Sequence, residues 1–323
     1  MGDRVFHASF RSPLSRAATA PPLQTLETLK LRCQCGAFSC AVSCAAPSAS
    51  ASVPLHCHCV KCRKFHAAAF AALLRVEDPP DVLLKSAAAN GPHVFESACD
   101  GLSTTLARLF CGRCKSVLGA RAASDGDGDR GAFYLAMGCI DDASIPPALA
   151  LAWQTSCRAI AVEQAAGWWS ARPVATRGPS SPARTLRGRC ACGACVFEAA
   201  SGVEFQLQHC YCNLCRRLSG SVAQTWVPVR DSTFLWRSDS TLELVRTTPH
   251  GSRHMCTRCG TTLTIVYDAQ PDCVWPVAGV LDDDSLPADL PRALGRTIHI
   301  CCSMMQAWYE LPDDGLPRLK YAG

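Results

Sequence analysis

Three cysteine motifs occur twice in this chain, in the same order. Each copy has a C-x-C-G motif, then an H-C-x-C-x-x-C-R motif, then a C-x-x-C motif. In the first copy the cysteines are Cys33, Cys35, Cys57, Cys59, Cys62, Cys111 and Cys114. In the second copy they are Cys190, Cys192, Cys210, Cys212, Cys215, Cys256 and Cys259. Three matches in one order indicate an internal duplication, which constrains the fold more than any local pattern does.

The duplication extends beyond the cysteines and divides the chain in two. Residues 138–146 (GCIDDASIP) match residues 279–287 (GVLDDDSLP). Between the copies, residues 170–184 (SARPVATRGPSSPAR) have the composition of a linker. A length of 323 residues suits two domains, each with a core of its own. The predicted division is a flexible N-terminal extension at 1–27, a first domain at 28–169, a linker at 170–184 and a second domain at 185–321.

Short strand-like runs dominate both copies. Residues 133–135 and 262–267 are examples, and Gly, Pro and Asp turns separate such runs. The alanine-rich residues 67–74 have helical propensity, but the matching residues 221–227 (SVAQTWV) favour a strand. We therefore predict a strand at both places and a mainly β fold.

The composition indicates a globular protein. Hydrophobic residues make up 48% of the chain and charged residues 18%, unlike a disordered or fibrous sequence. No run approaches the roughly 20 apolar residues that cross a bilayer, so we predict no membrane span. The net charge of +5 is small and no block of consecutive Lys and Arg occurs, so nucleic-acid binding is unsupported. The oligomeric state is not indicated by any pattern.

The 23 cysteines point to metal rather than to disulfides. Their number is odd, no secretory signal precedes them, and a chain of this size does not need covalent staples. We therefore expect metal binding in a reducing compartment and an intracellular, cytoplasmic protein. Residues 1–22 contain three arginines against one acid, which leaves organelle targeting as a weaker alternative to a disordered tail.

Seven motif cysteines in each copy divide naturally into four and three. Four thiolates close a tetrahedral structural zinc site, whereas three leave the open position typical of a catalytic zinc. Joining the first and last motifs of each copy gives the four-cysteine hypothesis: Cys33, Cys35, Cys111 and Cys114, then Cys190, Cys192, Cys256 and Cys259. The middle motifs give the three-cysteine sets: Cys57, Cys59 and Cys62, then Cys210, Cys212 and Cys215. Two zinc ions per domain are therefore expected, and an open site of net charge −1 suits a further thiol.

Alternatives remain for these sets and for the other candidate residues. Pairs such as Cys33 and Cys35 could bind metal only to hold the fold, and His56, His58 or His209 could close a three-cysteine set as a fourth ligand. His56 and His209 are also possible bases, although buried histidines beside strands are the commoner case. Residues 125–129 and 282–284 are aspartate-rich, and we interpret the first as a hairpin turn and the second as a solvated turn. We assign no function to the nine remaining cysteines: Cys40, Cys44, Cys99, Cys139, Cys157, Cys195, Cys273, Cys301 and Cys302.

The order and spacing of these motifs resemble those of the glutathione-dependent formaldehyde-activating enzyme family, also called the centromere protein V family. The resemblance covers both halves, and His299 and Trp308 resemble the C-terminal part of the family pattern. It implies tandem tent-like domains of antiparallel β-sheets, with a structural four-cysteine zinc and a second zinc on the C-x-C-x-x-C motif. The implied activity is that of a carbon-sulfur lyase that joins glutathione to formaldehyde as S-hydroxymethylglutathione.

The second half matches the family pattern more closely. Gly260 follows its last cysteine pair where the first half has Lys115, and 218–220 (LSG) stands where the first half has 65–67 (FHA). His299 lacks a histidine counterpart, because Trp153 falls near the corresponding place. If one half alone is active, we expect it to be the second.

Two other hypotheses compete with the lyase. One is a zinc-stabilised binding module for protein or nucleic acid that has no catalysis, as the centromere-protein name of some relatives suggests. The other keeps the fold but moves the chemistry to a different thiol or electrophile, because function depends on sites and not on folds.

Overall fold

The computed structural model describes residues 26–45, 52–77, 79–84, 92–123, 131–166, 169, 185–200, 206–286 and 296–322. The predicted linker at 170–184 and the predicted turn at 125–129 lie outside these ranges, as do residues 1–25 of the predicted extension. Leu26 and Glu27, the last two residues of that extension, already belong to the first strand.

The first half is built on a seven-stranded sheet and a separate hairpin. The hairpin pairs β1 (Leu26–Arg32) with β2 (Ser39–Ala45), and alternation in β1 turns Leu29 and Leu31 into the core. The large sheet has the order β5-β6-β7-β8-β4-β3-β9. Its strands are β3 (Pro54–Cys57), β4 (Ala71–Val76), β5 (Pro92–Cys99), β6 (Thr104–Cys111), β7 (Val117–Ala122), β8 (Phe133–Ala136) and β9 (Arg158–Ile160). The helices of this half are α1 (Val60–His66), α2 (Asp81–Leu84) and α3 (Pro147–Ser156).

The second half repeats this arrangement with its strands divided among three sheets. Their orders are β10-β11-β15, β13-β12-β20 and β14-β19-β18-β17-β16. The early strands are β10 (Thr185–Arg189), β11 (Val196–Ala200), β12 (Gln206–Cys210), β13 (Gln224–Trp226) and β14 (Val229–Arg230). The later strands are β15 (Phe234–Ser238), β16 (Leu242–Thr248), β17 (Gly251–Cys256), β18 (Thr262–Tyr267), β19 (Cys273–Pro276) and β20 (Arg296–Ile300), and the helix is α5 (Asn213–Ser219).

The predicted mainly β fold is confirmed. The predicted run at 262–267 is β18, and the run at 133–135 lies in β8. The strand predicted at 67–74 begins only at Ala71, because the preceding residues follow the end of α1. Most pairs are antiparallel, but β3 pairs parallel with β9 and β12 pairs parallel with β20. Among the described residues, no helix has the length and apolarity needed to span a bilayer.

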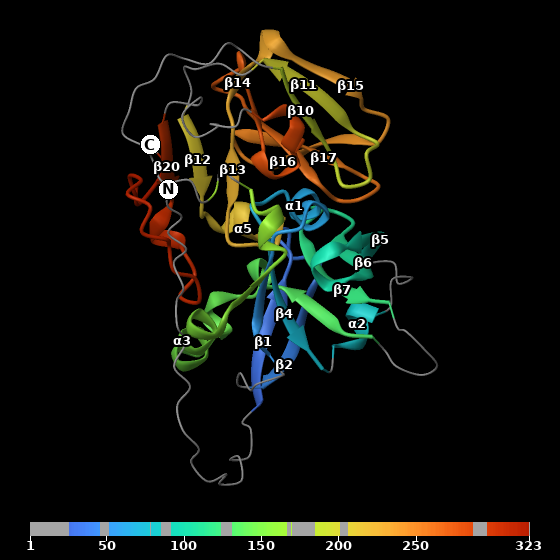
Figure 1. Cartoon of the computed structure of the whole chain (residues 1–323), viewed down its shortest axis with the longest axis vertical. Coiled ribbons are helices and arrows are strands. Elements are labelled where there is room, and N and C mark those ends of the chain that lie inside the picture. The colour runs from blue at the N-terminus through green and yellow to red at the C-terminus, as the bar shows by residue number, and fades with distance from the viewer. Residues whose placement is uncertain are drawn as a thin grey trace, which may run out of the picture.

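The two halves contact each other reciprocally through their short helices. Helices α1 and α5 lie where the halves meet (Figure 1). α1 packs on the turn η6 (Ala278–Val280) of the second half, and α5 packs on the matching turn η2 (Met137–Cys139) of the first. Each half therefore contributes one helix and one turn to the interface.

Buried cations on each helix pair with acids of the opposite half. Arg63 of α1 reaches Asp283 at 2.5 Å. The Nη1 and Nη2 atoms of Arg216 in α5 donate to Asp142 at 3.0 and 2.6 Å. Both arginine side chains are almost fully buried in the complete chain, so the acids of the opposite half supply charge partners where water is excluded.

The two helices end in the same left-handed conformation with different residues. The α5 C-cap is Gly220 at φ +66°, whereas the α1 C-cap is Ala67 at φ +48°. A Cβ atom in this region costs roughly 1 kcal/mol or more. We therefore expect Ala67→Gly to raise the free energy of unfolding by about 0.5–1 kcal/mol, measured by denaturant titration. An unchanged or lower midpoint would show that Ala67 is not strained.

Candidate metal centres

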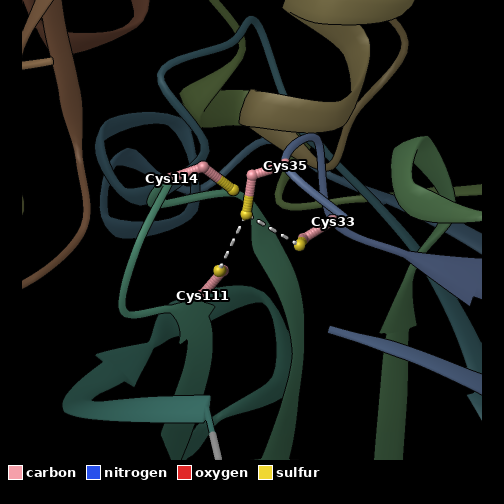
Figure 2. Close-up of side chains that lie close together, drawn as sticks. All are labelled: Cys33, Cys35, Cys111 and Cys114. Atoms are coloured by element: carbon pink, nitrogen blue, oxygen red, sulfur yellow. Dashed lines mark hydrogen bonds between the residues drawn. The ribbon is translucent and has the colours of Figure 1, made fainter. Parts of the chain in front are cut away.

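The first and last motifs of each half form a cluster of four thiols. Figure 2 shows the sulfur atoms of Cys33, Cys35, Cys111 and Cys114 gathered where the hairpin and the large sheet meet. Sγ of Cys35 lies 3.5 Å from Sγ of Cys33 and 3.9 Å from that of Cys111. The second half brings together the matching four residues: Cys190, Cys192, Cys256 and Cys259. Each proposed set of four thus occupies one place, from which it could hold a metal ion.

Local hydrogen bonds orient these thiols. In both halves the first cysteine accepts a backbone N–H five residues ahead at 3.3 Å, from Phe38 or from Cys195. The last cysteine lies 3.3 Å from a hydroxyl oxygen in the first half and 3.2 Å in the second, those of Ser116 and Thr261. Donors aimed at sulfur favour the thiolate, the form that binds metal.

The middle motifs lie at the start of α1 and α5. Cys59 and Cys212 are the N-cap residues, and each accepts the backbone N–H of the cysteine three residues later at 3.4 Å. The preceding cysteines, Cys57 and Cys210, end strands β3 and β12. A strand end and one helical turn therefore bring the three thiols of each set together.

The two middle sets differ in exposure and in number of thiols. In the first half a fourth cysteine, Cys99, completes a fully buried cluster with Cys57, Cys59 and Cys62. In the second half the cluster has three members, and Cys212 is partly exposed to solvent. Cys301 lies near Cys210 and Cys212 and influences the pKa of both thiols, but it lies outside the cluster. The repeat could not identify Cys99, because this cysteine lies outside the motifs and has no counterpart in the other copy.

Known proteins were compared with this chain. The model of the glutathione-dependent formaldehyde-activating enzyme family matches residues 28–156 and 185–303. The chain belongs to this family. A protein of Halomonas elongata, provisionally named a glutathione-dependent formaldehyde-activating enzyme, is 29% identical over 136 residues, which cover 39% of this chain and 80% of that protein. A solved Rhodobacter sphaeroides protein is 21% identical, covers 35% of this chain and 98% of its own, and superposes with a TM-score of 0.27.

A buried arginine contacts the middle cysteine set in each formaldehyde-activating-enzyme repeat. Arg108 of β6 donates to Sγ of Cys62 from Nη1 at 3.5 Å and from Nη2 at 3.6 Å. Arg253 of β17 donates to Sγ of Cys215 at 3.5 Å. A guanidinium charge there offsets the excess negative charge of several thiolates on one divalent ion. Each arginine stands three residues before the last cysteine pair, a repeat match that our sequence reasoning overlooked.

The second repeat carries a buried hydrogen-bonded chain beside its middle cysteines. The Tyr211 hydroxyl lies 2.9 Å from Nδ1 of His299, and Nε2 of His299 lies 3.0 Å from Asp314. Burial lowers the pKa of His299 and raises the pKa of Tyr211, so both are neutral at pH 7. Nε2–H therefore donates to the carboxylate and Nδ1 accepts from the tyrosine. These hydrogen bonds hold Tyr211, the residue between Cys210 and Cys212, in place.

The histidine alternatives find other partners. His299 pairs with His209 across parallel strands, and Ala159, not Trp153, occupies the matching place in the first repeat beside His56. His56 stacks on Phe70, with ring centroids 4.3 Å apart. No histidine belongs to any of the four metal-competent clusters found among the described residues.

Proposed function

We propose that this chain is a zinc-dependent carbon-sulfur lyase that acts on a glutathione-aldehyde adduct of the S-hydroxymethylglutathione type. In the forward direction the glutathione sulfur forms a bond to the formaldehyde carbon while the thiol proton passes to the carbonyl oxygen. The reverse reaction breaks that C–S bond and returns the proton, so no oxidant or reductant is needed. The family match and the partly exposed three-thiol cluster of the second repeat support this proposal.

The donor set fits zinc. Four thiolates about 2.3 Å from a tetrahedral zinc have sulfur-sulfur edges of roughly 3.8 Å. Two sulfur pairs in each four-cysteine cluster are separated by 3.5–3.9 Å, and all four sulfur atoms of a cluster lie within 4.8 Å of one another. We propose structural zinc at both clusters, which join the first and last motifs of domains spanning 28–169 and 185–321. Soft thiolates without carboxylates favour zinc over magnesium or calcium.

We place the reacting site at Cys210, Cys212 and Cys215. A zinc ion there would supply an open position that lowers the pKa of an incoming thiol. Cys212 is the ligand that solvent reaches, so the substrate thiol enters beside it. Arg253 balances charge from the buried side, and Tyr211 holds the segment between the first two cysteines.

The test is adduct formation by the zinc-loaded chain. Glutathione and formaldehyde are mixed with the protein, and S-hydroxymethylglutathione is followed by exchange NMR against the spontaneous rate. We expect acceleration, and at least a tenfold loss of it in Cys212→Ser, because one zinc ligand is removed. Cys273→Ser, which changes a half-buried thiol outside the clusters, should keep the rate. Zinc-loaded protein that gives no rate above the spontaneous one would rule out this substrate.

A further inference from the structure

We propose that Cys99 turns the middle cysteine set of the first repeat into a closed four-thiolate metal site, which leaves one open metal site per chain. The assignment of four ligands rests on the geometry of the first repeat alone. The placement of the reacting site in the second repeat rests on the proposed function.

Cys99 occupies the place that a fourth tetrahedral ligand needs. Its Sγ lies 3.8 Å from that of Cys57, 4.0 Å from that of Cys59 and 3.6 Å from that of Cys62. These distances are close to the roughly 3.8 Å edges expected around a tetrahedral zinc and are far longer than a disulfide bond. All four side chains are at most 1% exposed. Four buried thiols thus surround one point from all sides.

The hairpin that carries Cys99 also covers the site. Asp100–Leu102 form a short 3-10 turn between β5 and β6. A Cβ atom added at Gly101 would lie 2.7 Å from Sγ of Cys57 and 3.3 Å from two apolar side chains. Backbone packed this closely leaves no space for an incoming glutathione molecule. The glycine allows the tip to seal the cluster.

Charge at this cluster also suits four thiolates. Two guanidinium nitrogens of Arg108 contact Cys62, and the arginine side chain is fully buried. Four thiolates on one divalent ion leave a charge of about −2, which such a buried cation partly offsets. In the second repeat Arg253 donates to Cys215 through one nitrogen, consistent with a set of three thiolates.

Among its described residues, the second repeat has neither a fourth ligand in the cluster nor a matching cover. Its hairpin closes between Thr248 and Gly251 with only Pro249 and His250 between them, so no residue occupies the place of Cys99. Cys301 stands at the position of Ala161, since both follow the parallel strand pair and both have positive φ. Cys301 lies close enough to Cys210 and Cys212 to influence the pKa of both thiols, but it does not belong to the cluster of three.

Thiol binding to cobalt-substituted protein tests this directly. The full chain is loaded with Co²⁺ in a phosphine reductant, and β-mercaptoethanol is titrated while the thiolate-to-cobalt absorption is recorded. We expect the spectral change to saturate at one thiol per chain. Two thiols per chain would show that the first repeat is also open, and none would show that the second is also closed. Either result would overturn the proposal, even if every variant failed to fold.

Cys99→Ser provides the second arm. With four cobalt ions retained, this variant should show weaker thiolate-to-cobalt absorption, because a weak hydroxyl replaces one thiolate ligand, and it should still bind one thiol, because the hairpin still covers the cluster. Cys40→Ser, which changes a half-buried thiol of β2 outside the clusters, should keep the full absorption. Four retained cobalt ions and an undiminished absorption in Cys99→Ser would contradict the proposal. Adduct assays are independent: a chain that binds one thiol but makes no S-hydroxymethylglutathione would refute the substrate and leave the closed site intact.

Discussion

Replacement of Asp282 by asparagine is expected to lower the free energy of unfolding by about 3 kcal/mol. Its carboxylate is 7% exposed, accepts from Lys64 of the opposite half at 2.6 Å and receives paired bonds from Arg189. Burial alone would raise the pKa of Asp282, but the bonds from Arg189 and Lys64 outweigh it and hold the pKa below its usual value. Removal of this charge leaves the Lys64 ammonium buried without its counter-ion.

The measurement is thermal or denaturant unfolding, with a decrease in Tm of about 4–5 °C for a chain of 323 residues that unfolds as one unit. Asp141→Asn is the matched control, because Asp141 stands at the same place in the first repeat but is 28% exposed. It meets Arg217 at 3.2 Å and Arg32 at 3.4 Å, contacts worth about 1 kcal/mol or less. Equal losses in both variants would show that burial of the Asp282 pair is not what matters.

Gly279→Ala is expected to cost at least about 3 kcal/mol and to loosen the contact between the halves. A Cβ atom there would lie 2.3 Å from the backbone nitrogen of Ala68 and 2.6 Å from the carbonyl carbon of Ala67. Backbone atoms at the end of α1 cannot move aside, so the turn and the helix must separate. A Cβ atom added at the matching Gly138 would lie 2.4 and 2.5 Å from the backbone oxygens of Ser221 and Arg216.

Gly112→Ala is the control for Gly279→Ala, because the atom that obstructs the new methyl group belongs to a movable side chain and not to the backbone. A Cβ atom at Gly112 would lie 2.4 Å from Nε2 of His93, the far end of an exposed side chain. That imidazole can rotate away, so the free energy of unfolding should change by less than about 1 kcal/mol. Unfolding curves of both variants test the difference. A mild effect of Gly279→Ala would show that the interface can adjust at this turn.

The fold class and the gathering of the motif cysteines followed from the repeat itself. A match between two copies shows which residues recur, and recurring cysteines in one order must converge in each domain. Cys99 could not be found this way, because it exists in one copy and its position depends on hairpin length. Its partner Cys57 is distant in the chain, and no local pattern links them.

The prediction of a solvated turn at the aspartate-rich residues 282–284 is correct for Asp283 and Asp284, which are exposed, and wrong for Asp282. Asp282 is buried and Asp283 binds Arg63 of the opposite half. Composition predicts exposed side chains here, because single aspartates in turns usually face water. The match with residues 138–146 could have indicated the buried position. An acidic pair present in both copies suggests a matching cation in each, and these cations are Arg63 and Arg216.

The reciprocal interface gives the chain the form of a dimer whose two subunits are one polypeptide. In an assembly of identical chains, any substitution changes both subunits at once, and a ligand added to one site is added to the other. Covalent fusion removes that constraint. A cysteine can enter one hairpin and not its twin, so one half can specialise in holding the assembly together while the other keeps an accessible set of thiols.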